Sequence, residues 1–244
     1  MGENIRRKGA LDRIQQNISE HGRHVYVVAG GPSPRFAYTI GVSRVLGEEL
    51  LLAGGSFYSN DDAVQILNEI ATRLAAGSAD KIGMFVVAGF GSFSLRRAHT
   101  SWVRTLMLGA LDFYDTDDVP ALQLVPDEAH TTMDVPNSSV ELDSSIEPIW
   151  RWQTEPWNYS IASNSVAVTN LAALRGERIT EAMRWEEDEW ELFAGAGPDV
   201  PPEDVRTVPI GTLLAADVSL GPVVNLPLSG GLWRDAISDW HHWR

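Results

Sequence analysis

The residue types that carry most enzyme chemistry are few and scattered in this sequence. It has no cysteine among its 244 residues, which excludes disulfides, thiolate metal ligands and cysteine nucleophiles. Its six histidines are not spaced as a ligand set: Gly22 separates His21 from His24 where a helix should end, and His241 and His242 lie in a terminal tail. The sequence therefore predicts no metal, no cofactor and no catalytic residue.

Nucleotide-binding and acyl-transfer motifs are incomplete as well. Segments 89–91 and 195–197 each read Gly-x-Gly but lack the third glycine of a dinucleotide-binding loop. Neither Lys8 nor Lys81 lies in a phosphate-binding loop, and no serine occupies a Gly-x-Ser-x-Gly elbow. The acids in 115–118 lack the glycine and distal glutamate of a calcium loop, so a solvated helix end is the simpler interpretation.

One strand-like run, Phe36–Val42, has two unequal faces. Alternation places bulky side chains on one face and the small residues Ala37, Thr39 and Gly41 on the other. A small face lets a helix or a ligand approach the sheet closely, and a packed helix is the commoner cause. If a ligand binds there, Thr39, His24 and Tyr38 are its candidate contacts.

A second candidate is an acidic hairpin between two tryptophans. Strands are predicted at 179–185 and 190–194, joined by a turn of four consecutive acids. Protein interfaces favour tryptophan at their centre and charge at their rim. The candidate partner contacts are therefore Trp185, Glu186, Glu187, Asp188 and Trp190. The equal alternative is that both indoles pack in a core beneath the hairpin.

The charge of the chain constrains its partners. The formal net charge is −14, from 19 Lys+Arg and 33 Asp+Glu. Nucleic-acid binding needs Lys and Arg to displace phosphate counterions, so we expect no nucleic-acid partner. A basic protein would be attracted, although acidity also serves solubility alone.

The hydropathy pattern indicates the compartment. No apolar run is long enough to cross a bilayer, and no apolar core follows the basic N-terminal cluster. We therefore expect a cytoplasmic protein that does not bind a membrane. The sequence does not indicate an oligomeric state.

The elements that must position these residues follow from apolar spacing. Helices are predicted at 4–20, 60–74 and 103–114, the last after a cap at Thr100 or Ser101. Short apolar runs predict strands at 25–29, 36–42, 50–53, 84–88 and 121–125. In the second part, a helix is predicted at 209–216 and a strand at 223–226.

Composition divides the chain in two. Turn-forming residues concentrate between Pro126 and Pro148, and eight of the nine tryptophans lie from Trp150 onward. We therefore predict a domain over 1–136, a linker over 137–149 and a tryptophan-rich domain over 150–244. The fold class is α+β, with two small domains that each consist of a mainly antiparallel sheet and packed helices.

The first part resembles a family of uncharacterised bacterial proteins, domain of unknown function four-two-six-two. The resemblance rests on His21–Val25, Phe36–Gly41 and Gln123–Asp127, and covers roughly residues 8–136. At 47–50 the chain reads Gly-Glu-Glu-Leu, where the family usually has Gly-His-Pro-Glu-Leu. The resemblance implies no established activity.

The second part resembles domain of unknown function two-one-eight-five, grouped with immunity proteins of bacterial polymorphic toxin systems. The matching residues are Val168–Asn170, Met183–Glu186, Trp190–Gly195, Pro209–Leu214, Asp217–Leu220 and Pro222–Pro227. This resemblance covers about residues 160–235 and implies a partner protein, a toxin domain.

These observations favour a non-enzymatic protein-binding module, with a bacterial immunity protein that neutralises a basic toxin domain as the specific hypothesis. The alternative is a small-ligand-binding protein or a hydrolase-type enzyme that uses the small face of 36–42. No catalytic set in the sequence supports the enzyme.

The absence of a ligand cluster yields a direct prediction. The purified protein should contain no stoichiometric zinc, manganese or iron, because its histidines are scattered and it has no thiolates. Elemental analysis that finds about one such metal per chain would overturn this prediction and favour the enzyme.

Overall fold

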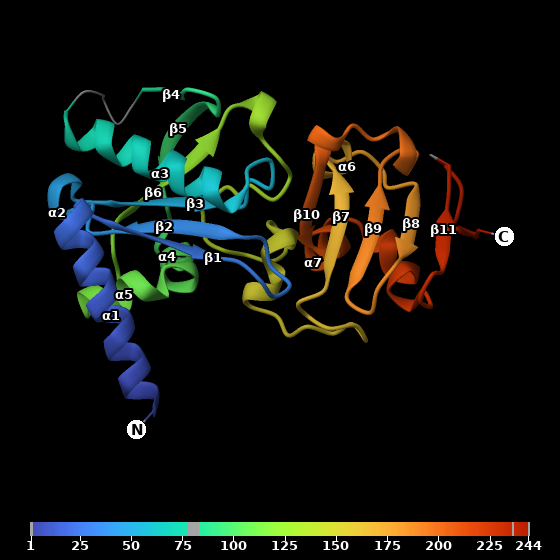
Figure 1. Ribbon diagram of the computed structural model, residues 1–244, viewed down its shortest axis with the longest axis horizontal. Helices are drawn as coiled ribbons and strands as arrows, with labels where there is room; N and C mark the ends of the chain where they lie inside the picture. Colours follow the sequence, from blue (N-terminus) through green and yellow to red (C-terminus); the bar gives the residue numbers. More distant parts are fainter. Residues whose placement is uncertain (1, 78–82, 236, 244) are drawn as a thin grey trace.

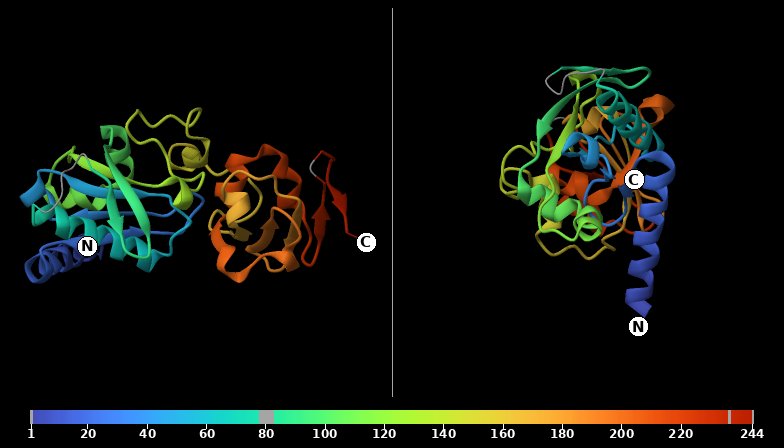
Figure 2. Two further views of the ribbon diagram at one scale, coloured as in Figure 1. Left: turned by 90° about the horizontal axis from the view of Figure 1, so that it is seen from above. Right: turned by 90° about the vertical axis from the view of Figure 1, so that its left-hand side faces the viewer.

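The computed structural model describes residues 2–77, 83–235 and 237–243. Its elements form two units along the long axis of the molecule, each built on a six-stranded sheet (Figure 1). The two units also lie end to end when seen from above (Figure 2). Each sheet is mixed but mainly antiparallel and packs against helices, so the predicted α+β class is confirmed.

The sheet of the first unit has the strand order β1-β2-β3-β6-β5-β4. Its strands are β1 (His24–Val28), β2 (Phe36–Ile40), β3 (Glu49–Ala53), β4 (Phe85–Val87), β5 (Gly91–Arg97) and β6 (Ala121–Pro126). Neighbouring strands are antiparallel except β3 and β6, which are parallel. No strand range was predicted for β5, because its serines and its pair of arginines interrupt any apolar run.

Helices cover both faces of this sheet. They are α1 (Gly2–His21), α2 (Ser43–Leu46), α3 (Asn60–Ala75), α4 (Thr100–Leu106) and α5 (Leu108–Tyr114). The apolar stripe of α3 packs on the face that contains Ala37, Leu50 and Leu52. Residues of α1, α4 and α5 pack on the opposite face, against Phe36 and Tyr38. The predicted single helix over 103–114 breaks at Met107, whose backbone is not helical.

The sheet of the second unit has the order β10-β7-β9-β8-β11-β12. Its strands are β7 (Val166–Asn170), β8 (Glu181–Arg184), β9 (Glu189–Phe193), β10 (Val205–Pro209), β11 (Gly231–Trp233) and β12 (His241–His242). Helices α6 (Leu171–Leu174) and α7 (Ile210–Ala216) and the 3-10 helix η5 (Val218–Asn225) share one apolar core with it.

The predicted strand over 223–226 is wrong, because most of these residues lie in η5. Asp217 accepts a hydrogen bond from the Ser219 backbone N–H and so caps the start of η5. Val223 and Val224 then point into the core of the second unit, which satisfies their hydrophobicity without a strand.

The predicted linker over 137–149 runs along the first unit. Ser138 is buried and donates to Gln123, while Ile149 and Trp150 lie in the core of the first unit. The Trp150 ring meets Trp102 edge-on at 5.5 Å, and its indole N–H donates to the Asp134 carbonyl at 3.0 Å. Trp150, which composition placed at the start of the second domain, therefore packs in the core of the first unit.

Close contacts join the two units. The Met133 side chain packs against the cores of both, and its backbone N–H donates to the Leu174 carbonyl at 2.8 Å. The Trp152 indole donates to the carbonyl of Gly211, at the start of α7. A Cβ at Gly211 would lie 2.3 Å from the Pro32 carbonyl oxygen, so this approach requires glycine.

Short 3-10 helices complete the secondary structure, namely η1 (Glu128–His130), η2 (Pro148–Gln153), η3 (Gly197–Asp199) and η4 (Pro202–Asp204).

Within the described residues, none of the helices combines the length and apolarity that crossing a bilayer demands.

Trp150→Ala should destabilise the protein strongly, because it removes a fully buried indole and its hydrogen bond to Asp134. We expect a loss of about 3–5 kcal/mol in the free energy of unfolding, measured by denaturant titration. Val45→Ala, at an exposed position, should cost less than about 0.5 kcal/mol. Equal losses for the two variants would contradict this assignment of Trp150 to the core.

Candidate functional site

Other parts of the chain cover the small-residue face of β2. Ala37 packs beneath α3, and Thr39 is fully buried with its hydroxyl donating to Glu49 Oε2 at 2.6 Å. A helix and a carboxylate therefore account for the small side chains, and the structure leaves no opening for a ligand at Thr39. The ligand alternative at this face loses its geometric support.

The Glu49 carboxylate accounts for the threonine and the glycine near the end of β2. The carboxylate is fully buried and accepts from the backbone N–H groups of Gly41 and Ser43 as well as from Thr39. The Tyr114 hydroxyl donates to Glu49 Oε1 at 2.5 Å. Gly41 reaches this position with φ 108°, in the region that favours glycine. Through these four hydrogen bonds the carboxylate holds the end of β2 in place.

Burial changes the titration of the tyrosine in this network. Burial, followed by the hydrogen bond to Glu49, raises the pKa of Tyr114 to about 12. Tyr114 therefore stays protonated and keeps donating at neutral pH.

His24 and Tyr38 lie on the sheet face opposite α3. The rings of Tyr38 and Tyr26 stack at 5.6 Å, and His24 meets Tyr26 edge-on. His24 Nδ1 lies 2.7 Å from the Asn17 amide, and burial followed by the charge of Arg13 lowers the pKa of His24. Both side chains have structural partners and do not converge with Thr39.

The acidic hairpin divides its two tryptophans between core and surface. Trp190 is fully buried, and its indole donates to the Val223 carbonyl, so it offers no surface to a partner. Trp185 is 48% exposed. Trp190 lies in β9 and points toward the helices. Trp185 follows the last residue of β8, and its backbone N–H donates to the Glu189 carbonyl, so the alternation of the strand, extended by one residue, places Trp185 on the other face. Of the candidate partner contacts in the hairpin, Trp185 and the acids beside it therefore remain at the surface.

One face of the second sheet is not covered by helices. Inward residues of β7, β8, β9 and β11 are buried, whereas most of the alternate residues are half-buried or exposed, with Asn170, Phe193 and Gly231 as the buried exceptions. We call the uncovered surface over β8, β9, β11 and β12 the open face. Its principal side chains are Met183, Trp185, Glu191, Trp233 and Trp243.

Two tail residues extend this surface. Trp233 and Trp243 are 43% and 44% exposed, and β11 and β12 bring them to the same side of the sheet. The Trp243 ring lies over Gly231, where a Cβ would come within 2.5 Å of it and 3.0 Å of Met183 Sδ. The Trp233 ring is 5.0 Å from His241. Neither tryptophan was among the predicted contacts, because the C-terminal tail shows no strand pattern in the sequence.

Acidic residues border the open face at the β8–β9 hairpin. Residues 181–191 contain six acids and one cation, Arg184. The Arg184 guanidinium stacks on Trp190 at 4.7 Å and donates to the carbonyls of Leu226 and Glu187. The resulting surface has aromatic side chains beside an excess of negative charge.

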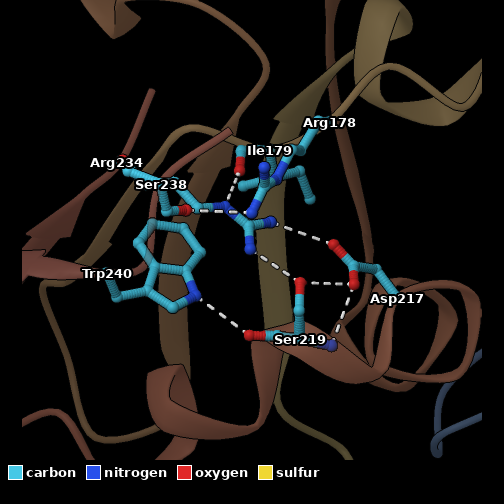
Figure 3. Close-up of polar contacts among 7 residues, drawn as sticks. All are labelled: Arg178, Ile179, Asp217, Ser219, Arg234, Ser238 and Trp240. Carbon is cyan, nitrogen blue, oxygen red and sulfur yellow. Dashed lines mark hydrogen bonds and ion pairs between the residues drawn. The ribbon is translucent and has the colours of Figure 1, made fainter. Parts of the chain in front are cut away.

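A buried arginine, Arg234, anchors the chain directly after β11 (Figure 3). The Arg234 guanidinium is enclosed and donates to the Ile179 carbonyl, the Ser219 hydroxyl and Asp217 Oδ2. Trp240 stacks over it at 4.1 Å and donates its indole N–H to the Ser219 carbonyl. Arg234 thereby ties β11 and the C-terminal tail to η5.

The described residues contain no group of three or more His, Asp or Glu side chains that could hold a metal ion. The closest histidine–carboxylate pair is His130 with Asp127, at 2.6 Å. Asp127 also accepts from the Ser92 backbone N–H, so this pair joins η1 to the start of β5.

Fold and surface together define a two-unit α+β protein with a tryptophan-rich sheet face. Residues 17–131 match the family model described as Domain of unknown function (DUF4262), within the first unit. The match includes the strand on which the sequence resemblance depends. It does not reach residues 160–235, where the resemblance to the second family stays a prediction. No curated protein and no solved structure matches the chain.

Asp217 provides a pH test of the Arg234 cluster. Burial opposes ionisation, but hydrogen bonds from Ser219 and Arg234 outweigh it and lower the pKa of Asp217. Because folding lowers the pKa of this carboxyl group, its ionised form stabilises the folded protein at pH values above the unfolded pKa of about 4. This stabilisation is lost as the pH falls through the pKa of the folded state.

Asp217→Asn should therefore cost about 2 kcal/mol at pH 7 and less in acid, as measured by urea unfolding. Asp117→Asn, at an exposed position, is the matched control and should change little at either pH. A cost for Asp217→Asn that does not shrink in acid would show that the carboxylate charge is not what holds Arg234.

Proposed function

We propose that the protein acts by binding another protein through the open face. The observation that carries the proposal is three tryptophans, each close to half exposed, on one side of a sheet whose other side is packed. Isolated apolar side chains on a surface need no explanation, but tryptophans gathered on one face are typical of interaction sites.

Charge indicates the kind of partner. The acids of 181–191 would oppose an acidic surface and attract a basic one. We therefore propose a basic partner protein, with Trp185, Trp233 and Trp243 as its apolar contacts and the acids as the surrounding rim. Indole rings can bury a large area there at low cost in side-chain entropy.

A bacterial toxin domain is the specific partner that we propose, with this chain as its immunity protein. The support is the resemblance of residues 160–235, together with the acidic surface, since a basic nuclease toxin would meet complementary charge. The first unit then serves as the scaffold that fixes the second through Met133 and Trp152.

The experiment uses the protein encoded beside the gene of this chain. We expect the two to co-purify, the complex to weaken as salt rises, and co-expression to rescue growth if the neighbour is toxic. Trp233→Ala should weaken binding by about 2 kcal/mol, or roughly thirtyfold in the dissociation constant. Calorimetric titration measures the change.

Two control variants separate the open face from general effects. Leu108→Ala removes an exposed apolar side chain on the first unit and should leave affinity unchanged. Glu187→Lys should slow association more than Asp117→Lys, which makes the same charge change far from the hairpin. If no neighbouring protein binds, or if Trp233→Ala binds as tightly as the unaltered chain, the proposal fails.

A further inference from the structure

A cavity of about 550 Å³ lies at the junction of the two units, away from the open face. One wall comes from the β1–β2 loop, Arg35 and residues 56–62. The other wall comes from Asn164 and from β10, which is the edge strand of the second sheet. Its volume falls within the range of small-molecule sites, and such sites commonly form where domains meet.

Arg35 supplies the first unusual feature of this cavity. Its Nη2 donates to the carbonyls of Gly55 at 2.8 Å and Tyr58 at 3.3 Å. Its Nη1 is buried and has no hydrogen-bond partner. A buried donor without a partner is costly, and it is costlier still on a charged group. Burial also lowers the pKa of Arg35 from its ordinary value.

Arg206 approaches from the second unit. Its Nε donates to the Phe57 carbonyl at 2.9 Å, and its Nη1 donates to the carbonyls of Glu203 and Val205. None of these hydrogen bonds uses Nη2. The guanidinium also lies over the Phe57 ring at 5.3 Å. The β3–α3 loop is therefore held between two arginines, one from each unit.

Neither arginine is neutralised by contact with an acid. Within the described residues, no ion pair joins Arg35 or Arg206 to a carboxylate. Asp62 also lines the cavity, but its carboxylate accepts from the Ser59 backbone N–H in the capping box of α3. The cavity wall thus contains two cations and one acid. The first turn of α3 contains Asp61 and Asp62, which offset the positive potential of its N-terminal end.

We infer that this cavity binds a small molecule that carries a carboxylate or phosphate group. Two guanidiniums recognise the planar or tetrahedral oxygens of such groups with directed N–H donors. The amides of Asn60 and Asn164 and the hydroxyl of Thr207 line the rest of the space and would orient the remaining polar groups of the ligand. Because both units supply an arginine, the ligand would also strengthen their docking.

Calorimetric titration of the full chain with inorganic phosphate and with acetate tests this inference, against chloride at matched ionic strength. We expect saturable binding of at least one probe by the unaltered chain. Phosphate binding without acetate binding would assign a phosphate-bearing ligand, and the reverse would assign a carboxylate. Arg206→Ala should lower the affinity for that probe about tenfold or more.

A second variant keeps the test decisive if Arg206→Ala loosens the junction. Thr207→Trp places a large ring at an exposed lining position and leaves both arginines in place, so it should abolish binding by filling the space. Arg104→Ala removes an exposed arginine elsewhere and should have no effect. The inference is overturned if neither probe binds saturably, or if Arg206→Ala and Thr207→Trp both bind as the unaltered chain does.

Discussion

One-sided burial of the second sheet is the constraint on which the functional account depends. In the first unit, helices pack on both sheet faces, and the apolar residues of β2 and β3 are divided between two cores. In the second unit, α6, α7 and η5 pack on one face only. Mixed and antiparallel sheets tolerate this arrangement when the free face is polar. Here the free face carries three tryptophans, which a partner could cover.

Two buried ionic groups keep the framework in place. Glu49 ties the end of β2 to α5 through Gly41 and Tyr114, and Arg234 ties β11 to η5 through Asp217. Both charges are satisfied by several hydrogen bonds each, which offsets the cost of removing them from water. Arg35, by contrast, has a buried Nη1 atom without a hydrogen-bond partner, and it lies at the junction of the two units.

Amphipathic helices can be predicted well from this sequence, whereas the core in which an individual side chain packs is harder to predict. The helix over 60–74 was found because its apolar stripe and its capping residues agree, and α3 occupies nearly the same range. The predicted linker and the placement of Trp150 depended on composition, which does not show which core an aromatic side chain enters. Trp185 and Trp190 look equivalent in sequence, and only the strand register separates core from surface. Arg35 and Arg206 are 171 positions apart, so no local pattern could bring them together.

Hydrogen–deuterium exchange of the chain, alone and bound to the protein encoded beside its gene, shows whether the open face is the binding surface. Backbone amides of β8, β9, β11 and β12 belong to the sheet that would be covered, and binding suppresses the local opening through which they exchange. We expect added protection in 181–191, 231–235 and 237–243, with little change in α3 and α5. Protection confined to the first unit would contradict this expectation.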